Sequence, residues 1–174
     1  MEEYSKLMTS GIDLEKIISS CKKCSKLIKK GKNIICHSQL RTTNLEYNKT
    51  PYGFIINTSN DPSIFGHWFS LMISSKKDAF FCDGLDYVKK LPDVMTNVYY
   101  FCQRNGLNLK IMSIRCQENK SSSCGFISLY FLAKFSTLSI QRFIKLPNLF
   151  KKNSIKTNEL SALRYVKYHY KLNL

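Results

Sequence analysis

The chain has 174 residues and a formal net charge of +15. Hydrophobic residues make up 44% of it and charged residues 22%, a composition that is typical of a folded globule and excludes a disordered tail. The length suits a single domain, residues 1–174, with a sizeable core.

The seven cysteines are an odd number and lack the regular spacing of a small secreted scaffold. The polar N-terminus, Met1–Lys6, is not followed by a signal-peptide core. No stretch approaches the roughly 20 apolar residues that are needed to span a bilayer. We therefore expect a monomer with reduced thiols that is neither secreted nor bound to a membrane.

Apolar spacing and turn residues predict the elements in chain order. Apolar side chains recur at helical spacings from Leu14 to Ile28, which predicts a helix that Gly31 stops. Residues 32–53 are predicted to be irregular. The elements expected after them are strands at 54–57, 68–73 and 79–83, a helix from Pro92 to Gly106, a strand at 109–114, and helices at 124–135, 138–146 and 159–170. Together they predict an α+β fold, with a central mixed or antiparallel sheet packed by helices and a hairpin at 68–83.

Cys124 stands where the serine-rich loop Ser121–Ser123 meets the apolar helix predicted at 124–135. Unpaired amides and the positive dipole end of a helix N-terminus stabilise an anion such as a thiolate. Gly125 lets a substrate carbonyl approach the backbone closely. These features predict a nucleophile, and the alternative is a buried cysteine at a helix start.

His67 precedes the single tryptophan at the start of a predicted strand, where it could exchange a proton with a neighbouring thiol. Asp83 ends the partner strand of the hairpin, so strand pairing could bring its carboxylate to the imidazole. Asp86 is the alternative acid, and a turn-forming role is the alternative for both aspartates. The other histidines, His37 and His169, lack comparable settings.

Gln117 lies seven residues before Cys124, and its side-chain amide can donate a hydrogen bond to an oxyanion. With the Cys124 backbone N–H it would form a two-donor hole, in which each donor is worth about 3 kcal/mol of barrier. His67, Asp83, Gln117 and Cys124 together predict a cysteine endopeptidase that needs no metal or other cofactor for its chemistry.

These residues resemble adenain, the adenovirus maturation protease, whose relatives also occur in Maverick/Polinton elements. The resemblance covers roughly residues 50–136. It rests on Ile56-Asn57-Thr58 followed by His67-Trp68, on Gln117 followed by Cys124-Gly125, and on the apolar helix residues Phe126, Leu129, Tyr130, Phe131 and Leu132.

Related SUMO-specific and ubiquitin-like proteases share these residue types. They typically have one residue fewer between the glutamine and the cysteine, and an acid where this chain has Ser123. The acid here, Asp83, departs from adenain, which has a glutamate one residue further from the histidine. Aspartate is common at that position among the SUMO-type relatives.

The resemblance implies an adenain/SUMO-protease-like fold with its nucleophile at the N-terminus of a buried helix. It implies His67 as base, Asp83 as its orienting acid, Gln117 in the oxyanion hole and Cys124 as nucleophile. It further implies cleavage of viral precursor or capsid proteins at glycine-containing sites, in the virion and the host nucleus or else the host cytoplasm. The alternatives are a protease specific for SUMO or ubiquitin-like proteins and an inactive, basic DNA-binding relic.

Adenain is also stimulated by DNA and by a peptide cofactor that forms a disulfide with the enzyme. The lysine excess fits DNA as an activator, and solvated lysines from an A/T-rich coding sequence are the alternative. Peptide activation is unsupported, because Gly106 stands near the matching position and Cys102 is four residues earlier. The expected DNA contacts are Lys22, Lys23, Lys26, Lys29, Lys30, Lys151 and Lys152.

Cys21 and Cys24, with Cys36 and His37 further on, raise the possibility of a zinc site. Both cysteines of the first pair fall in the helix predicted to begin near Leu14, and Cys36 and His37 are adjacent, which is an awkward geometry for chelation. A redox role for the first pair would need a preceding strand. We therefore expect structural packing here and no metal.

Overall fold

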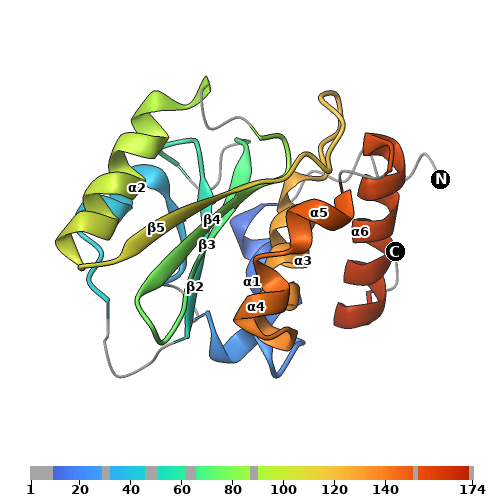
Figure 1. Ribbon diagram of the computed structural model, residues 1–174, viewed down its shortest axis with the longest axis horizontal. Coiled ribbons are helices and arrows are strands. Elements are labelled where there is room, and N and C mark those ends of the chain that lie inside the picture. Colours follow the sequence, from blue (N-terminus) through green and yellow to red (C-terminus); the bar gives the residue numbers. More distant parts are fainter. Residues whose placement is uncertain are drawn as a thin grey trace.

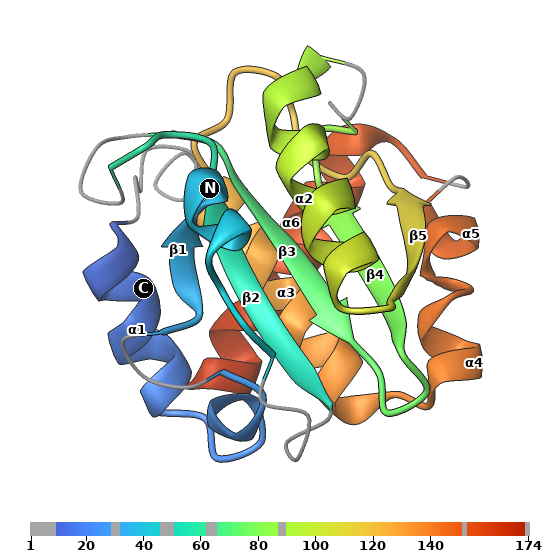
Figure 2. The same cartoon turned by 90° about the vertical axis from the view of Figure 1, so that its left-hand side faces the viewer.

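A five-stranded sheet lies between two layers of helices in the computed structural model (Figures 1 and 2). Strands β2, β3 and β4 pair antiparallel, and the outer strands β1 and β5 each run parallel to their neighbour. This arrangement confirms the predicted α+β fold with a mixed sheet. The structure describes residues 10–28, 32–45, 51–61, 66–86, 90–150 and 153–172. In spatial order the strands are β1 (Ile34–Cys36), β2 (Tyr52–Asn57), β3 (Trp68–Ile73), β4 (Asp78–Asp83) and β5 (Asn108–Ser113).

The three central strands are buried on both faces, because each face is covered by helices. Alternate side chains such as Phe54, Phe69 and Phe81 pack against α2 (Pro92–Arg104) and the 3₁₀ helix η3 (His37–Arg41). Figure 2 views the sheet from this side, with α2 in front of it. The side chains between them face the opposite core, which α3 dominates.

α3 (Cys124–Thr137) is the central helix of that second core, and its residues from Gly125 to Ala133 are all buried. A helix that is apolar on every side is expected to lie inside the molecule rather than on its surface. α3 lies between the sheet and α6 (Ile155–Tyr170). The remaining helices of this layer are α1 (Gly11–Ser19), α4 (Ile140–Phe143) and α5 (Leu146–Phe150).

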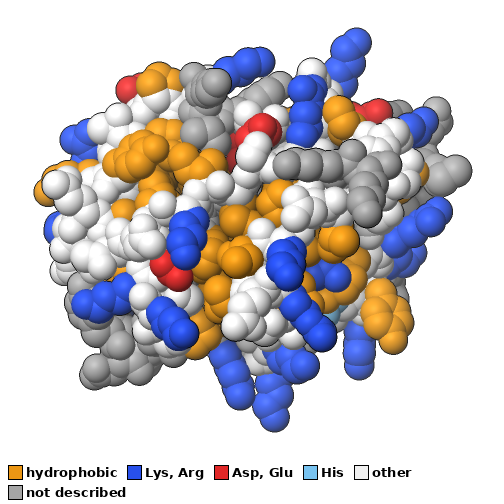
Figure 3. Space-filling view, viewed as in Figure 1, with side chains coloured by type: hydrophobic (Ala, Val, Ile, Leu, Met, Phe, Trp, Pro, Cys, Tyr) orange, Lys and Arg blue, Asp and Glu red, His pale blue; other side chains and the backbone are white. Residues whose placement is uncertain are grey.

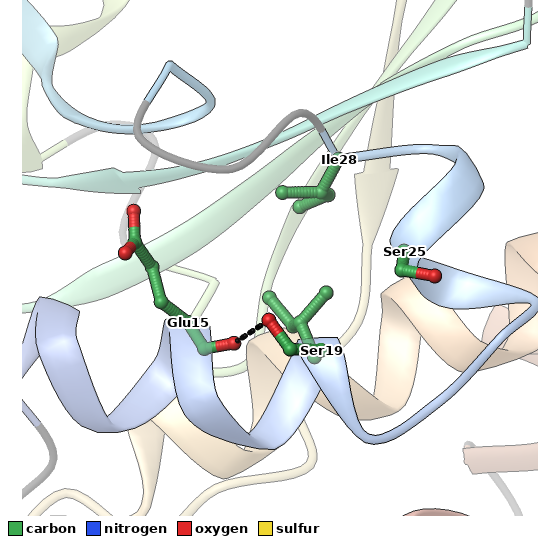
Figure 4. A pocket seen from close by; sticks show the side chains of 5 residues that line it. Glu15, Ser19, Ser25 and Ile28 are labelled. Atoms are coloured by element: carbon green, nitrogen blue, oxygen red, sulfur yellow. Dashed lines mark hydrogen bonds between the residues drawn. The ribbon is translucent and has the colours of Figure 1, made fainter.

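The predicted helix at 14–28 is wrong beyond residue 19, where α1 ends. The Ser19 hydroxyl donates to the Glu15 carbonyl (Figure 4), and such local serine bonds compete with continuation of a helix. The chain then turns into a single 3₁₀ turn, η2 (Cys24–Lys26), and folds back beside α1. Gly31, the expected stop, lies outside the described residues.

Two further boundaries differ from the sequence prediction. Residues 32–53, expected to be irregular, contain β1 and η3. The strand β1 has only three residues, and it forms because it pairs with β2, which a local sequence pattern does not reveal. The helix expected at 138–146 is two short helices, since Pro147 suits the first turn of a new helix, α5, instead of ending one. The hairpin β3–β4 and the helix α2, followed by Gly106 at a φ of 58°, are confirmed.

Within the described part of the chain, no helix is long and apolar enough to cross a membrane.

Candidate active site

The β3–β4 hairpin brings His67 and Asp83 together. Its register pairs Ser70 with Cys82, so the start of β3 lies beside the end of β4. The His67 Nε2 atom is 2.6 Å from Asp83 Oδ1, and the Leu85 amide donates to the same oxygen at 3.0 Å. Asp83 is 1% exposed and the His67 side chain 15%. A buried carboxylate therefore holds one ring nitrogen and fixes the orientation of the imidazole.

Gly66 permits the close approach of the chain that carries His67. A Cβ atom at Gly66 would lie 2.0 Å from Asn57 Oδ1 and 3.0 Å from the Ser59 backbone nitrogen. The Thr58 hydroxyl accepts from the His67 amide at 2.9 Å, and the Thr58 amide donates to the His67 carbonyl at 2.9 Å. These bonds extend the β2–β3 ladder to the histidine, so the His67 backbone is held by hydrogen bonds to the end of β2.

Cys124 is the first residue of α3, and its thiol faces the histidine strand. The Sγ atom lies 4.0 Å from the Gly66 carbonyl oxygen, and the thiol interacts with the His67 imidazole. No side chain caps α3, although Ser123 occupies the N-cap position. The nucleophile predicted from sequence therefore lies at an uncapped helix N-terminus, where the dipole favours an anion.

The surroundings of His67 favour its protonated form. Burial lowers the pKa of the imidazole, but hydrogen bonds to Asp83 and Cys124 and the charges of both outweigh it and raise the pKa to about 9. Since Nε2 is bonded to Asp83, the remaining nitrogen, Nδ1, is left for the sulfur. Asp83, His67 and Cys124 thus form a connected series of carboxylate, imidazole and thiol through which a proton can be transferred.

Gln117 lies in the irregular segment between β5 and α3. Its backbone amide donates to the Gly84 carbonyl at 3.0 Å, and its side-chain Nε2 donates to the Ser121 carbonyl at 2.9 Å. Among the described residues, its Oε1 is buried without a hydrogen-bond partner. A Cβ at Gly84 would lie 3.3 Å from that oxygen and 2.6 Å from Ile127 Cγ2 in the first turn of α3. Gln117 therefore packs beside the helix start with one amide hydrogen engaged and a second available for an oxyanion.

Glu159 on α6 is a residue of this site that the sequence analysis missed. Its carboxylate accepts from the Ser123 hydroxyl at 2.6 Å, from the Glu118 amide at 2.9 Å and from the Ser121 hydroxyl. Its side chain ties the whole loop between Gln117 and Cys124 to α6. The sequence did contain a signal for this residue. Glu159 lies at helical spacing from the buried residues Ala162, Leu163 and Val166, which places an acid on the apolar face of the last helix.

Asp86, the alternative acid, lies elsewhere: its carboxylate accepts from Ser113 at the end of β5, at 3.1 Å. His37 also has a partner outside this site, since its Nδ1 atom lies 2.8 Å from the side-chain amide nitrogen of Asn97 on α2. The structure therefore brings His67 to Asp83 and not to Asp86.

The seven cysteines differ in accessibility, and Cys124 alone is half-buried while the other six are buried. Burial raises the pKa of the Cys102 thiol to about 12, so Cys102 is poorly suited to a disulfide with a peptide cofactor. Burial raises the pKa of Cys82 and Cys116 as well.

The basic residues singled out in the sequence are described only in part. Lys22, Lys23 and Lys26 are exposed on the turn after α1, and Lys23 acts electrostatically on His169 near the end of α6. In Figure 3, Lys and Arg side chains project along the lower edge of the face shown and on its right, and the right is the side where Figure 1 has α6. The other expected DNA contacts, Lys29, Lys30, Lys151 and Lys152, lie outside the described residues.

The possible zinc grouping of Cys21 and Cys24 with Cys36 and His37, which the sequence argued against, does not form. Cys36 ends β1 and His37 begins η3, which packs against α2. Cys21 and Cys24 instead contact His169, whose setting on α6 looked unremarkable in the sequence. The three side chains are the described group with the right composition to hold a metal ion.

Comparison with known proteins gives little beyond this geometry. No family model matches the chain, and no curated protein is similar to it. Among solved structures, the chain is similar to the central domain of the uncharacterized Lpg1148 protein from Legionella pneumophila, at 12% identity and a TM-score of 0.41. The match covers 95% of this chain and 99% of the other, and a similarity at this level assigns no function.

Proposed function

We propose that this chain is a cysteine endopeptidase that acts through Cys124, His67 and Asp83. The observation that carries the proposal is the half-buried His67 imidazole, bonded to Asp83 at 2.6 Å and interacting with the Cys124 thiol. Covalent catalysis of acyl transfer requires a nucleophile, an adjacent base and a group that orients the base. Each of the three roles has one occupant here.

In the reaction, His67 takes the proton of the Cys124 thiol, which gives a thiolate and an imidazolium. The sulfur attacks the substrate carbonyl carbon, and the electron pair of the C=O bond moves to the oxygen. The Cys124 backbone N–H and the Gln117 side-chain amide stabilise this oxyanion. As the oxyanion collapses and the C–N bond breaks, His67 gives its proton to the leaving amine, and a thioester remains on the sulfur.

Hydrolysis of the thioester restores the starting state. The neutral imidazole of His67 accepts a proton from a water molecule as the water oxygen attacks the thioester carbonyl. Collapse of the second oxyanion expels the thiolate and releases the carboxylic acid. Asp83 stabilises the imidazolium at both stages and keeps the ring in one orientation.

We propose viral precursor and capsid proteins with glycine-containing sites as substrates, in the virion and host nucleus or in the host cytoplasm. This assignment rests on the resemblance to adenain. A protease specific for SUMO or ubiquitin-like proteins is the second candidate, favoured by an aspartate, Asp83, as the acid.

Peptides that contain Gly-Gly or Gly-X-Gly sites, and a fluorogenic ubiquitin-like substrate, test the proposal. Mass spectrometry of the products should reveal cleavage by the wild type and by the control His37→Ala, and none by His67→Ala or Cys124→Ser. Hydrolysis of the ubiquitin-like substrate alone would reassign the specificity. No cleavage of any substrate, with Cys124 alkylated by iodoacetamide no faster in the wild type than in His67→Ala, would identify a relic.

We further propose that DNA increases the cleavage rate by binding the exposed lysines after α1. Lys22, Lys23 and Lys26 are exposed. Lys23 acts electrostatically on His169, which lines a surface hollow together with Arg164 and Lys171. Stimulation should fall steeply with salt, because each neutralised phosphate releases condensed counterions. Cleavage assays with and without duplex DNA measure it, and a triple charge reversal at the three lysines should abolish the stimulation. Equal rates in both conditions would show the lysines to be solvated only.

A further inference from the structure

Three side chains of metal-binding type converge at the far end of α3 from Cys124. The Cys21 Sγ atom lies 3.3 Å from His169 Nε2, and Cys24 Sγ lies 3.6 Å from the same nitrogen. All three ligand atoms are within 4.8 Å of one another. Cys24 also contacts Ser136, 12 residues along α3 from Cys124, a separation of about 18 Å along a helix axis. This cluster is thus separate from the candidate active site.

The two sulfur–nitrogen distances match those between ligands of tetrahedral zinc. Zinc bonds to sulfur at about 2.3 Å and to imidazole nitrogen at about 2.0–2.1 Å, which sets a sulfur and a nitrogen about 3.6 Å apart at the tetrahedral angle. The two observed sulfur–nitrogen distances, 3.3 and 3.6 Å, lie close to this value. A small adjustment of the side chains would therefore let all three ligand atoms bind one ion.

The backbone after α1 makes chelation by Cys21 and Cys24 feasible. The sequence argument against a zinc site assumed that both cysteines lie within one long helix, but α1 ends at Ser19. The Cys21 amide bonds to the Ile18 carbonyl at 3.0 Å, and the Ser25 amide bonds to the Cys21 carbonyl at 2.9 Å. A Cys-x₂-Cys pair on a tight turn is the usual way in which one segment supplies two sulfurs to a zinc ion.

Neighbouring side chains hold the ligands in place. The His169 ring is stacked on Tyr165, with ring centroids 5.5 Å apart and an interplanar angle of 13°. The Tyr170 hydroxyl lies 3.2 Å from Cys24 Sγ, and the Ser136 hydroxyl lies 3.6 Å from it. Hydroxyl groups around a ligand sulfur and a fixed imidazole are the outer contacts that tune metal sites.

Solvent can reach the cluster on the α6 side. His169 is half-buried and lines a surface hollow together with Lys167 and Leu172. The hollow lies beside the histidine of the cluster, so this is the side from which we expect an ion to approach the three ligands.

We propose that Cys21, Cys24 and His169 bind one zinc ion, with water or another ligand in the fourth position. Two thiolates and an imidazole are the soft donors that select zinc over magnesium or calcium. Binding exchanges two thiol protons for Zn²⁺, so the net charge of the cluster stays the same and the nearby Lys23 and Lys134 do not oppose it. The ion links the turn after α1 to the end of α6.

Metal content and cobalt substitution test this site in the full chain. The chain is purified as wild type and as Cys124→Ser, which removes the other cysteine–histidine pair as a source of binding. Zinc measured by mass spectrometry should be about one equivalent per chain in both proteins. Titration with Co²⁺ should produce the charge-transfer and d–d absorption of a tetrahedral thiolate site. Both signals should be lost in Cys21→Ser and in His169→Gln.

Cys36→Ser and His37→Ala serve as matched controls and should keep the metal. Because Cys24 is fully buried and its substitution could unfold the chain, its role is read in the wild type instead. Bound zinc should protect Cys21 and Cys24, mapped by mass spectrometry, from alkylation. A chain without metal, metal unchanged in both cluster variants, or a disulfide between Cys21 and Cys24 after purification without reductant would each overturn the proposal.

Discussion

Among the described residues, cysteine and histidine side chains meet in two groups, and the surroundings of the two groups are opposite. His67 lies between the Asp83 carboxylate and the Cys124 thiol, which together raise its pKa to about 9 against the effect of burial. His169 faces two buried sulfurs, and its pKa is lowered by burial and by the charges of Lys23 and Lys134.

The difference shows that the third partner decides what a thiol and an imidazole can do. A carboxylate keeps a proton on the ring, so the first pair suits proton transfer with a thiolate. A second sulfur and a neutral ring leave a lone pair for a metal ion, so the second group suits chelation. Substitutions in the two regions should therefore change different measurements.

The largest expected effect is on cleavage by the first pair. Cys124→Ser and His67→Ala should each lower kcat/KM by about 10⁴-fold or more, because the covalent pathway is lost. Peptide cleavage measures this loss, and His37→Ala is the matched control.

Cys21→Ser and His169→Gln should instead lower the melting temperature of the zinc-loaded chain, since a bound metal stabilises the native state. A chelator that leaves the wild-type melting temperature unchanged would contradict this contrast.

Asp83→Asn should have the next largest effect. It should lower kcat by roughly 10²- to 10⁴-fold, because the asparagine amide carries no negative charge and therefore does not stabilise the imidazolium. The alkaline limb of the profile of kcat/KM against pH should also move down from about 9, since Asp83 raises the pKa of His67. Rates measured between pH 6 and 10 test both effects. Asp86→Asn should behave as the wild type; a shifted limb in that variant would make Asp86 the acid.

Glu159→Gln tests whether α6 positions the loop between Gln117 and Cys124. The neutral amide loses the charge-assisted bonds from Ser123 and the Glu118 amide, and a loop displaced by about 1 Å can cost roughly 10²-fold in rate. We expect kcat to fall by roughly 10- to 100-fold with KM nearly unchanged, measured by steady-state kinetics. Glu118→Gln, an exposed change in the same loop, is the control. An equal effect of both variants, or a change in KM alone, would reject a positioning role.

The smallest effect is on stability against pH. The folded-state pKa of His67, about 9, lies above its ordinary value of 6.5. Its stabilising interaction is therefore fully present below about 6.5 and is lost as the pH rises through about 9. Urea unfolding measures the free energies of unfolding of the wild type and of His67→Gln. The difference between them should shrink by at most roughly 3 kcal/mol as the pH rises over that range. A difference that grows with pH would have the wrong sign.

Much of the local structure could be predicted from the sequence. The local patterns are the runs of consecutive buried residues in β3 and β4, Pro92 at the start of α2 and the apolar α3. Each of them depends on neighbouring residues alone. The positions of His67 and Asp83 follow from one hairpin, because two strands joined by a short turn have a register that their own residues set.

Contacts between distant segments were decided by the tertiary structure. Glu159 reaches Ser123 across 36 positions and His169 reaches Cys21 across 148, and no periodicity carries such information. The break after Ser19, which makes the Cys21–Cys24 turn possible, was hidden because apolar spacing continues through it. Local patterns report which face of an element is apolar, whereas only packing of α6 against α3 determines which polar side chains meet.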